Sequence, residues 1–351
     1  MLPDITKSSS WSTKQAWSWY QDQRLVIGFN YLPSTAVNST EMWQNNDFDP
    51  VTIAKELSWA ASYGYNTARV FLQFLVWQDD PQGYLDRFEQ FLKIAHQNNI
   101  KIMPVFFDDC AFSNLEPYLG VQNAPVPLVH NSGWTPSPGT TYTDNPMSYK
   151  QLEQFVDAFL SAHRTDERIL LWDMYNEPGN SNRGARNLYL LEESFRWARK
   201  WQPIQPLTAG VWGMENGSAV EGTIFNDLKA LELSDIITFH HYGDSAAVDK
   251  TLKKYESLGY PVICTEWLAR VFFESYIETV LPVFKEHNAG SIHWGLVNGK
   301  TQTHIPWNHD KSKGEPTIWF HDVLHRDGTP YDEREMELIK QVSRQSRKEI
   351  S

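Results

Sequence analysis

The chain contains the run LLWDMYNEP, Leu170 to Pro178, in which apolar side chains lead into an Asn-Glu pair and a proline. This pattern predicts a buried strand that stops at Glu177, because proline cannot donate to the hydrogen-bond ladder of a central strand. A carboxylate at the end of a buried strand is costly unless it is paired or used in chemistry. The segment Pro261–Trp267 has the same order and places Glu266 at its end. The sequence therefore predicts two strand-end glutamates.

Seven other runs share the apolar character of the first. Most are apolar throughout rather than at alternate positions, as expected for parallel strands that are buried on both faces. The eight candidate strands are Leu25–Tyr31, Thr67–Phe71, Lys101–Phe107, Ile169–Tyr175, Leu207–Val211, Ile236–Phe239, Val262–Thr265 and Ser291–Leu296.

Segments of helical period separate these strands, and Asp49-Pro50 and Ser148 are helix N-terminal signals. Helices are predicted over Val51–Tyr63, Leu85–Ala95, Leu152–Leu160, Leu188–Trp201, Phe225–Leu231, Val248–Leu258, Tyr276–His287 and Tyr331–Val342. Eightfold alternation of strand and helix predicts a (β/α)8 TIM barrel. A doubly wound open sheet is the main alternative. No Gly-x-Gly-x-x-Gly turn follows the first strand and no P-loop occurs, which disfavours it.

The chain has 351 residues, and we expect them to form one catalytic domain, 1–351, with residues 1–22 as an extension packed on the barrel. Its 31 Lys and Arg against 43 Asp and Glu give a net charge of -12, which argues against nucleic-acid and anionic-membrane partners. Cys264 lies in an apolar run, so free thiols are expected rather than a bond to Cys110. No signal peptide or membrane span is evident, which predicts a cytoplasmic protein, or a secreted or periplasmic one whose leader was removed. The oligomeric state stays open.

Two connections are unusually long, Asp108–Pro146 after the third strand and Asn298–Phe320 after the eighth. Both follow strands, and barrel enzymes keep their active sites on the face where strands end. We expect these loops to wall a substrate cleft, although an insertion without function has the same length. Aromatic residues make up 14% of the chain, with 15 Trp. They suit a core, and equally a carbohydrate site, because flat rings stack on the C–H faces of sugars.

The strand ends bring polar side chains to one face. They are Arg69, Asp108, Asp109, Asn176, Glu177, His240, His241, Tyr242, Glu266 and Trp294. Two opposed carboxylates are what cleavage of a glycosidic bond requires, and their proximity pushes their pKa values apart. Arg69 and Tyr242 are expected to hold Glu266 ionised, Asn176 to contact a sugar hydroxyl, and Trp294 to floor the ring. Each residue alone has an ordinary structural explanation, but their grouping at the ends of several strands favours a site.

These elements resemble the family-5 glycoside hydrolases, whose catalytic glutamates lie on strands four and seven. The matching elements, in order, are Arg69 in Thr-Ala-Arg-Val, Asn176-Glu177-Pro178, His240-His241-Tyr242, Thr265-Glu266-Trp267 and Trp294. The resemblance implies that Glu177 is the acid/base and Glu266 the nucleophile of a retaining β-glycosidase that uses no metal and no organic cofactor. Besides the two glutamates, the residues we expect to bind the substrate are Arg69, Asn176, His240, Tyr242, Trp267 and Trp294 from these matching elements, together with Asp109.

One departure concerns the third strand, where many family members carry a histidine and this chain has Asp108-Asp109-Cys110. The usual cellulase specificity is therefore not expected to transfer. Exo action on short β-linked oligosaccharides or glycosides is slightly favoured, with linkage and sugar left open. Three alternatives remain: a transglycosidase of the same mechanism, a carbohydrate-binding barrel without catalysis, and an enolase-like magnesium site. Schiff-base chemistry is disfavoured, because no strand ends on a lysine.

Overall fold

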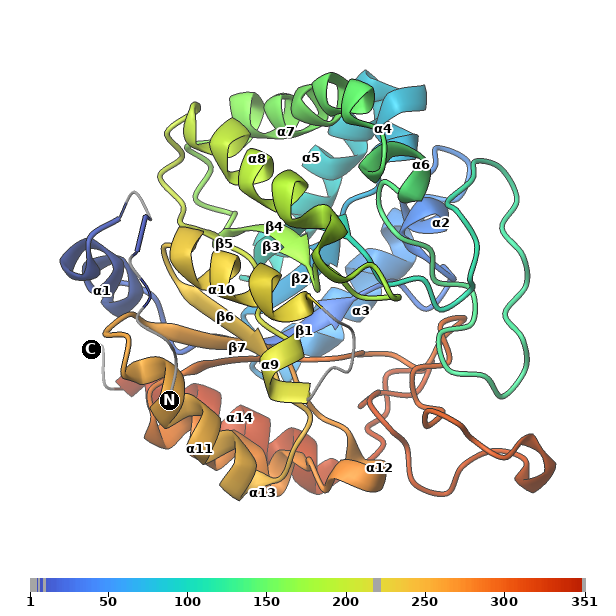
Figure 1. The fold of residues 1–351 in the computed structure, drawn as a ribbon. Coiled ribbons are helices and arrows are strands. Elements are labelled where there is room, and N and C mark those ends of the chain that lie inside the picture. The colour runs from blue at the N-terminus through green and yellow to red at the C-terminus, as the bar shows by residue number, and fades with distance from the viewer. Residues whose placement is uncertain (1–4, 6, 9–10, 217–221, 349–351) are drawn as a thin grey trace.

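The computed structural model describes residues 5, 7–8, 11–216 and 222–348, and its centre is a parallel barrel surrounded by helices (Figure 1). Its strands are β1 Ile27–Tyr31, β2 Thr67–Phe71, β3 Lys101–Asp108, β4 Trp172–Asn176, β5 Leu207–Thr208, β6 Ile237–His240, β7 Val262–Glu266 and β8 Gly290–His293. They hydrogen-bond in the order β5-β4-β3-β2-β1-β8-β7-β6. A parallel bridge between Val211 and Phe239 joins the two ends of this sheet. The predicted (β/α)8 barrel is confirmed.

All eight predicted helices are present, and further short ones lie in the connections. The α-helices are α1 Thr13–Gln21, α2 Ser39–Trp43, α3 Pro50–Ser62, α4 Phe74–Asp79, α5 Pro81–Gln97, α6 Thr140–Thr143, α7 Tyr149–His163, α8 Leu188–Arg199, α9 Gly213–Asn216, α10 Thr223–Leu233, α11 Ser245–Glu256, α12 Arg270–Phe273, α13 Ile277–Glu286 and α14 Glu333–Lys348. The 3-10 turns are η1 Pro146–Ser148, η2 Gly184–Asn187 and η3 Lys311–Lys313.

The two predicted N-terminal signals behave differently. Asp49 accepts a hydrogen bond from the Thr52 backbone N–H at 3.0 Å, with Pro50 in the first turn of α3. Ser148 precedes α7 but makes no capping hydrogen bond. The reason is that η1 runs directly into α7, and Asn145 caps η1 by accepting from the Met147 N–H at 3.1 Å. The cap lies one short turn earlier than the sequence predicts.

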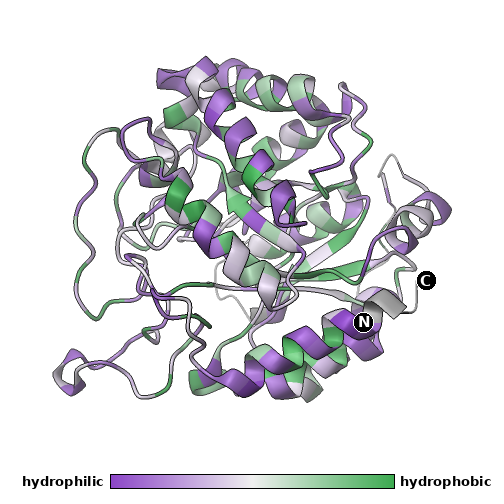
Figure 2. Cartoon of the chain, turned by 180° about the vertical axis from the view of Figure 1, so that it is seen from behind, coloured by the Kyte–Doolittle hydropathy of each residue, from purple (hydrophilic) through white to green (hydrophobic). Residues whose placement is uncertain are grey.

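The core lies between the barrel and its helices, and in Figure 2 the central strands are largely hydrophobic while the helices carry mixed faces. Aromatic side chains fill this layer between β3, β4 and α7. Phe106 stacks on Trp172 with ring centroids 5.4 Å apart and meets Phe155 edge to face at 5.6 Å. Both cysteines, Cys110 and Cys264, are buried and free, as predicted. Much of the large aromatic content is therefore core.

The two long connections lie on the same side of the molecule in Figure 1, away from α1. They are hydrogen-bonded to each other: the Asn131 N–H donates to the Thr301 carbonyl at 2.8 Å, and the Leu128 N–H donates to Gln302 Oε1 at 2.9 Å. Gln302 Nε2 returns a bond to the Val126 carbonyl at 2.8 Å. We call residues 109–139 and 298–320 together the two-loop wall. It stands on the face where the strands end.

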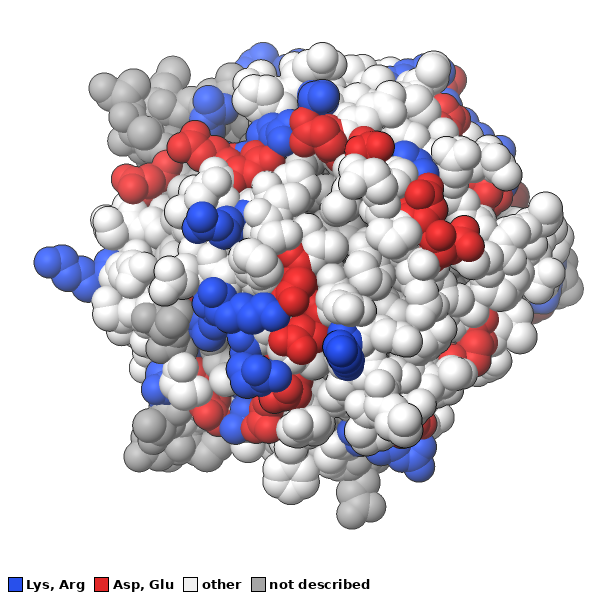
Figure 3. All heavy atoms as spheres, turned by 90° about the horizontal axis from the view of Figure 1, so that it is seen from above, with Lys and Arg blue, Asp and Glu red and all other residues white. Residues whose placement is uncertain are grey.

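At the other end of the barrel, α1 contacts the body of the protein. Tyr20 donates its hydroxyl to the Asn288 carbonyl at 2.9 Å, and Trp17 Nε1 donates to the Gly259 carbonyl at 2.8 Å. Part of the expected extension 1–22 lies outside the described residues. On the face seen in Figure 3, Lys and Arg lie among Asp and Glu rather than in one basic field. Within the described part of the chain, no helix is long and apolar enough to cross a bilayer.

Candidate active site

Glu177 directly follows β4 and is placed by a sharp turn in the backbone. Its φ is 43°, in the left-handed region that a side chain with a Cβ rarely adopts. The Asn180 N–H closes the turn by donating to the Glu177 carbonyl at 3.0 Å. Such strain persists only where the surroundings impose it, and it is typical of functional sites. The turn brings the carboxylate to the mouth of the barrel, where it is 8% exposed.

Glu266 ends β7 and is held by two donors. Arg69 Nη1 donates to its Oε1 at 3.0 Å, and the Tyr242 hydroxyl donates to its Oε2 at 2.8 Å. A register shift between Phe239 and His240 pairs His240 with Glu266 across β6 and β7. The shift brings the imidazole beside both glutamates.

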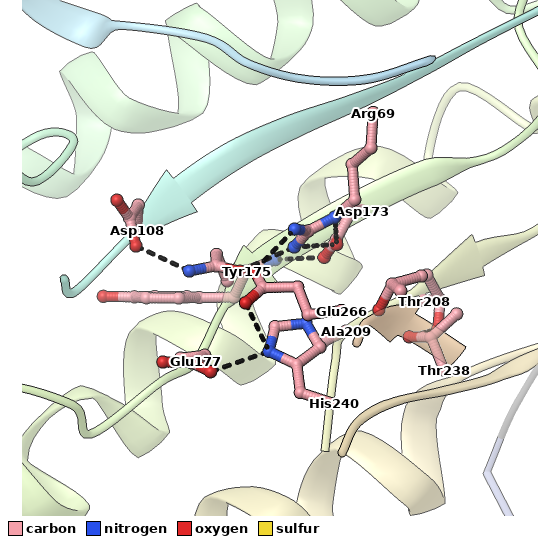
Figure 4. Close-up of polar contacts among 12 residues, drawn as sticks. Arg69, Asp108, Asp173, Tyr175, Glu177, Thr208, Ala209, Thr238, His240 and Glu266 are labelled. Atoms are coloured by element: carbon pink, nitrogen blue, oxygen red, sulfur yellow. Dashed lines mark hydrogen bonds and ion pairs between the residues drawn. The ribbon is translucent and has the colours of Figure 1, made fainter. Parts of the chain in front are cut away.

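The two carboxylates and the imidazole form one compact group. An oxygen of Glu177, an oxygen of Glu266 and a nitrogen of His240 all lie within 4.8 Å of one another. His240 Nδ1 lies 2.7 Å from Glu177 Oε1 and 3.6 Å from Glu266 Oε2, and Figure 4 shows the ring between the two side chains. Burial lowers the pKa of His240 to about 4, so the ring is neutral. Whether Glu177 is ionised or protonated, one proton occupies its contact with Nδ1.

The surroundings of the two glutamates differ in charge. Burial raises the pKa of both carboxyl groups. Glu266 touches the Arg69 guanidinium directly, whereas Glu177 Oε2 receives only neutral donors, Asn180 Nδ2 at 2.5 Å and the Cys110 thiol at 3.3 Å. Two like charges this close do not both ionise easily, and the cation favours the charge on Glu266. Glu177 is therefore the group that keeps a proton.

Arg69, on β2, is completely buried and organises the floor of the site (Figure 4). Besides Glu266 it contacts Asp173 Oδ2, with Nε at 3.0 Å and Nη2 at 2.8 Å. It also donates to Asn30 Oδ1 at 2.8 Å and to Asn176 Oδ1 at 2.6 Å. Arg69 does not line the cavity, so it acts by positioning Glu266 and Asn176.

Asp108 occupies the end of β3, where the family resemblance expects a histidine. One of its oxygens accepts from Asn176 Nδ2 at 2.8 Å and from the Cys110 N–H at 3.0 Å, and the other accepts from Trp134 Nε1 at 2.7 Å. Burial raises the pKa of Asp108 to about 7, against the effect of these three donors. Asp108 thus holds Asn176 and Trp134 from behind the cavity.

Four of the predicted substrate-binding residues are not among those that line the cavity: Arg69 and His240, which contact the catalytic glutamates, and Asp109 and Trp267. Asp109 is turned toward the barrel wall, where it accepts from the Tyr175 hydroxyl at 2.9 Å and the Gly179 N–H at 2.7 Å. Neighbouring side chains at a strand end point to opposite sides, so Asp108 and Asp109 do not share a direction. Trp267 is 2% exposed and packs on Phe284 with ring centroids 5.3 Å apart. Neither Asp109 nor Trp267 lines the cavity in this arrangement.

The glutamates open into a cavity of about 490 Å³ with a largely aromatic lining. Trp294, as predicted, is part of this lining and meets Trp134 and Phe71 edge to face, both with ring centroids 5.8 Å apart. The cavity is lined by Cys110, Phe112, His130, Trp134, Asn176, Glu177, Asn180, Trp212, Glu215, Tyr242, Glu266, Phe273, Trp294, Trp307 and His321. Sequence reasoning missed most of the loop members, because loops carry no periodic pattern that would show which side chains turn inward.

Glu177, His240 and Glu266 are also residue types that ligate divalent cations, so the magnesium alternative meets the same side chains. The contact between His240 and Glu177 already engages Nδ1, and Nε2 of the same ring is buried. A cation would have to displace the first contact to gain a nitrogen ligand. The hydrogen-bonded arrangement therefore favours acid-base chemistry over metal binding.

No protein-family model matches the chain, and no curated protein sequence does. Solved structures share its fold. An exo-β-1,4-mannosidase from Opitutaceae bacterium strain TAV5 has a TM-score of 0.62 and 16% identity. The match covers 93% of this chain but only 60% of the mannosidase. A family-5 glycoside hydrolase mannosidase from Rhizomucor miehei has a TM-score of 0.56 and 14% identity, and the match covers 93% of this chain and 94% of the mannosidase. An endo-1,4-β-D-mannanase from Thermotoga petrophila RKU-1 has a TM-score of 0.58 and 14% identity, and the match covers 92% of this chain and 100% of the mannanase. At these identities the likeness establishes the fold.

Proposed function

We propose that residues 1–351 form a single catalytic domain, a retaining β-glycoside hydrolase of the family-5 type. The observation that carries this proposal is the spacing of the two carboxylates, because an oxygen of one lies within 4.8 Å of an oxygen of the other. Retaining enzymes hold their carboxyl groups about 5–5.5 Å apart, whereas inverting enzymes leave about 6.5–9.5 Å for a water molecule. Glu177 and Glu266 fit the first arrangement.

In the first step, an oxygen of Glu266 attacks the anomeric carbon and forms a covalent glycosyl-enzyme. The bond to the leaving oxygen breaks, and Glu177 gives that oxygen its proton. In the second step, ionised Glu177 takes a proton from water, and the resulting nucleophile displaces Glu266 from the same carbon. Arg69 and Tyr242 donate to Glu266 and so stabilise it as a carboxylate before attack and after release. At the end of the cycle Glu177 is protonated again and Glu266 is again a carboxylate.

The substrate proposed is a short β-linked oligosaccharide or glycoside, cleaved from its end. The two-loop wall supports exo action, because backbone and side-chain hydrogen bonds join its halves beside the cavity. Trp294 offers a flat ring on which a sugar face can stack. β-Mannosides are the first class to test, since the structural neighbours are named as mannosidases and mannanases. The family resemblance implies no metal and no organic cofactor.

The test is a panel of aryl β-glycosides with leaving groups of graded acidity, assayed with the wild type and with Glu177→Ala. We expect the variant to keep turnover only on activated leaving groups, which depart without proton donation. For substrates with poorer leaving groups, the variant should turn over about 10²–10⁴-fold more slowly than the wild type, which is the usual contribution of general acid catalysis. An equal loss on every leaving group would contradict the acid role of Glu177.

Glu266→Ala separates this proposal from a carbohydrate-binding barrel without catalysis. If the protein is a hydrolase, Glu266→Ala loses turnover. The wild type then also releases products that retain the β configuration. A binding protein has no turnover to lose and keeps its affinity. Products longer than the substrate would instead favour a transglycosidase, which differs only in the acceptor of the second step.

A further inference from the structure

His130 lies in the two-loop wall, and the proposed mechanism does not use its side chain. It lines the cavity and is 8% exposed. Its Nδ1 lies 2.8 Å from the Ile305 carbonyl, which belongs to the other half of the wall. The histidine therefore joins the two loops with one nitrogen and leaves the other to be explained.

The carbonyl fixes the protonation of the ring. A backbone carbonyl can only accept, so Nδ1 carries the hydrogen and Nε2 presents a lone pair. Burial lowers the pKa of His130 to about 4, which keeps the ring neutral over the ordinary working range. Within the described residues, nothing donates to Nε2. Nε2 is thus an oriented and unused acceptor.

The neighbours of His130 are rings that hold it in one orientation. Phe112, Trp307 and Phe320 meet it edge to face with ring centroids 5.9, 6.0 and 5.8 Å away. The ring of His321 is 5.2 Å away, but that residue is fully buried and its Nδ1 is engaged by the Leu268 carbonyl. Of these two imidazoles, only His130 has an exposed fraction with which it can meet a ligand.

We propose that His130 Nε2 accepts a hydrogen bond from a hydroxyl group of the bound sugar. This inference rests on the proposed function and names a specificity residue for it. A lone pair in the same cavity as two buried glutamates attracts a hydroxyl donor and repels carboxylate or phosphate. The site therefore selects a neutral sugar with a free hydroxyl at one position over an uronate, a sugar phosphate or a methyl ether at that position.

A purely structural role for His130 predicts a different outcome, and two substitutions separate the two. His130→Asn keeps a donor near the position of Nδ1 for the Ile305 carbonyl but cannot reach the place of Nε2. His130→Gln keeps an acceptor near the place of Nε2 but gives up the bond between the loops. The bond from Asn131 to Thr301 still joins the wall in both variants.

The experiment compares kcat/KM of the wild type and both variants on the best aryl β-glycoside and on its monodeoxy derivatives. His130→Asn should lose about two- to ten-fold on the parent glycoside, the effect of one neutral hydrogen bond. That loss should vanish on one deoxy derivative, and His130→Gln should keep most of the parent activity. The inference is wrong if His130→Asn matches the wild type, or if its loss is the same on every deoxy derivative.

A wild type without turnover on any aryl glycoside would contradict the proposed hydrolase function, and this outcome is distinct from failure of the His130 inference. In that case the same variants and glycosides are compared by isothermal titration calorimetry. A loss of affinity in His130→Asn that disappears on one deoxy derivative supports the inference, and an equal loss on all of them overturns it.

Discussion

Replacing Cys110 by alanine tests how the protein tunes its proposed acid. The thiol donates to Glu177 Oε2 at 3.3 Å, and Asn180 Nδ2 donates to the same oxygen at 2.5 Å. Both bonds favour the ionised carboxylate, so the loss of either raises the pKa of Glu177 above its value in the wild type. A higher pKa keeps the acid protonated to a higher pH. The alkaline limb of the pH profile should therefore move upward.

The size of the shift follows from the geometry of each bond. A thiol is a weak donor and the contact is long, so its loss costs about 0.5 kcal/mol of carboxylate stabilisation. The hydrogen bond from the Asn180 amide is shorter, and its loss costs about 1.5 kcal/mol, so it raises the pKa of Glu177 further. The alkaline limb should therefore lie at the highest pH in Asn180→Ala, at a lower pH in Cys110→Ala and at the lowest pH in the wild type. The charged and titratable neighbours Arg69, His240 and Glu266 are the same in all three.

The assay is the pH dependence of kcat/KM, whose alkaline limb reports the acid in the free enzyme. Cys264→Ala is the matched control, because this second buried thiol donates to the Glu266 carbonyl rather than to a carboxylate. The control should leave the limb in place. A limb that stays fixed or moves downward in Cys110→Ala would refute the reasoning, as would a shift confined to the acid limb.

Three further predictions concern the floor of the site, its histidine and the metal alternative. Arg69→Met should destabilise the fold by about 3–5 kcal/mol in urea unfolding, since it leaves Asp173 and Glu266 buried without their cation; adding Asp173→Asn should recover part of the stability but no activity. Gly210→Ala should reduce kcat about tenfold with little change in KM, because the new Cβ would lie 2.9 Å from His240 Nε2 and displace the ring; unchanged kcat would count against a positioning role for His240. Dialysis against EDTA should leave kcat/KM unaltered, and a loss that Mg²⁺ restores would favour the metal site.

The fold could be predicted because buried strands and helices each show a regular pattern of apolar residues in the sequence. Strands buried on both faces are apolar runs such as 101–107, and helices show a period of 3.6 residues. Polar residues that end such runs, as Glu177 and Glu266 do, were predicted to meet because barrel strands all end on one face. Each of these inferences needs only the pattern of nearby residues in the sequence, or the rule that all strands of a barrel end on the same face.

The loop contributions could not be predicted, because their partners lie far away in the chain. His130 depends on a carbonyl at Ile305, and Cys110 gains its role from a carboxylate 67 positions later. No periodicity connects such pairs. Asp109 lies at a strand end, as predicted, but outside the cavity lining. The reason is local, because the direction of a side chain at a strand end depends on a register that the sequence does not show.

The difference between the two glutamates follows from the position of one buried cation. Arg69 rises from β2 and reaches Asp173 on one side and Glu266 on the other, so one guanidinium compensates two carboxylates on separate strands. Glu177 receives no such contact, because the turn at its positive φ carries its carboxylate toward Asn180 and Cys110. The asymmetry that assigns proton donor and nucleophile is therefore set beneath the cavity, by a residue that the substrate does not touch.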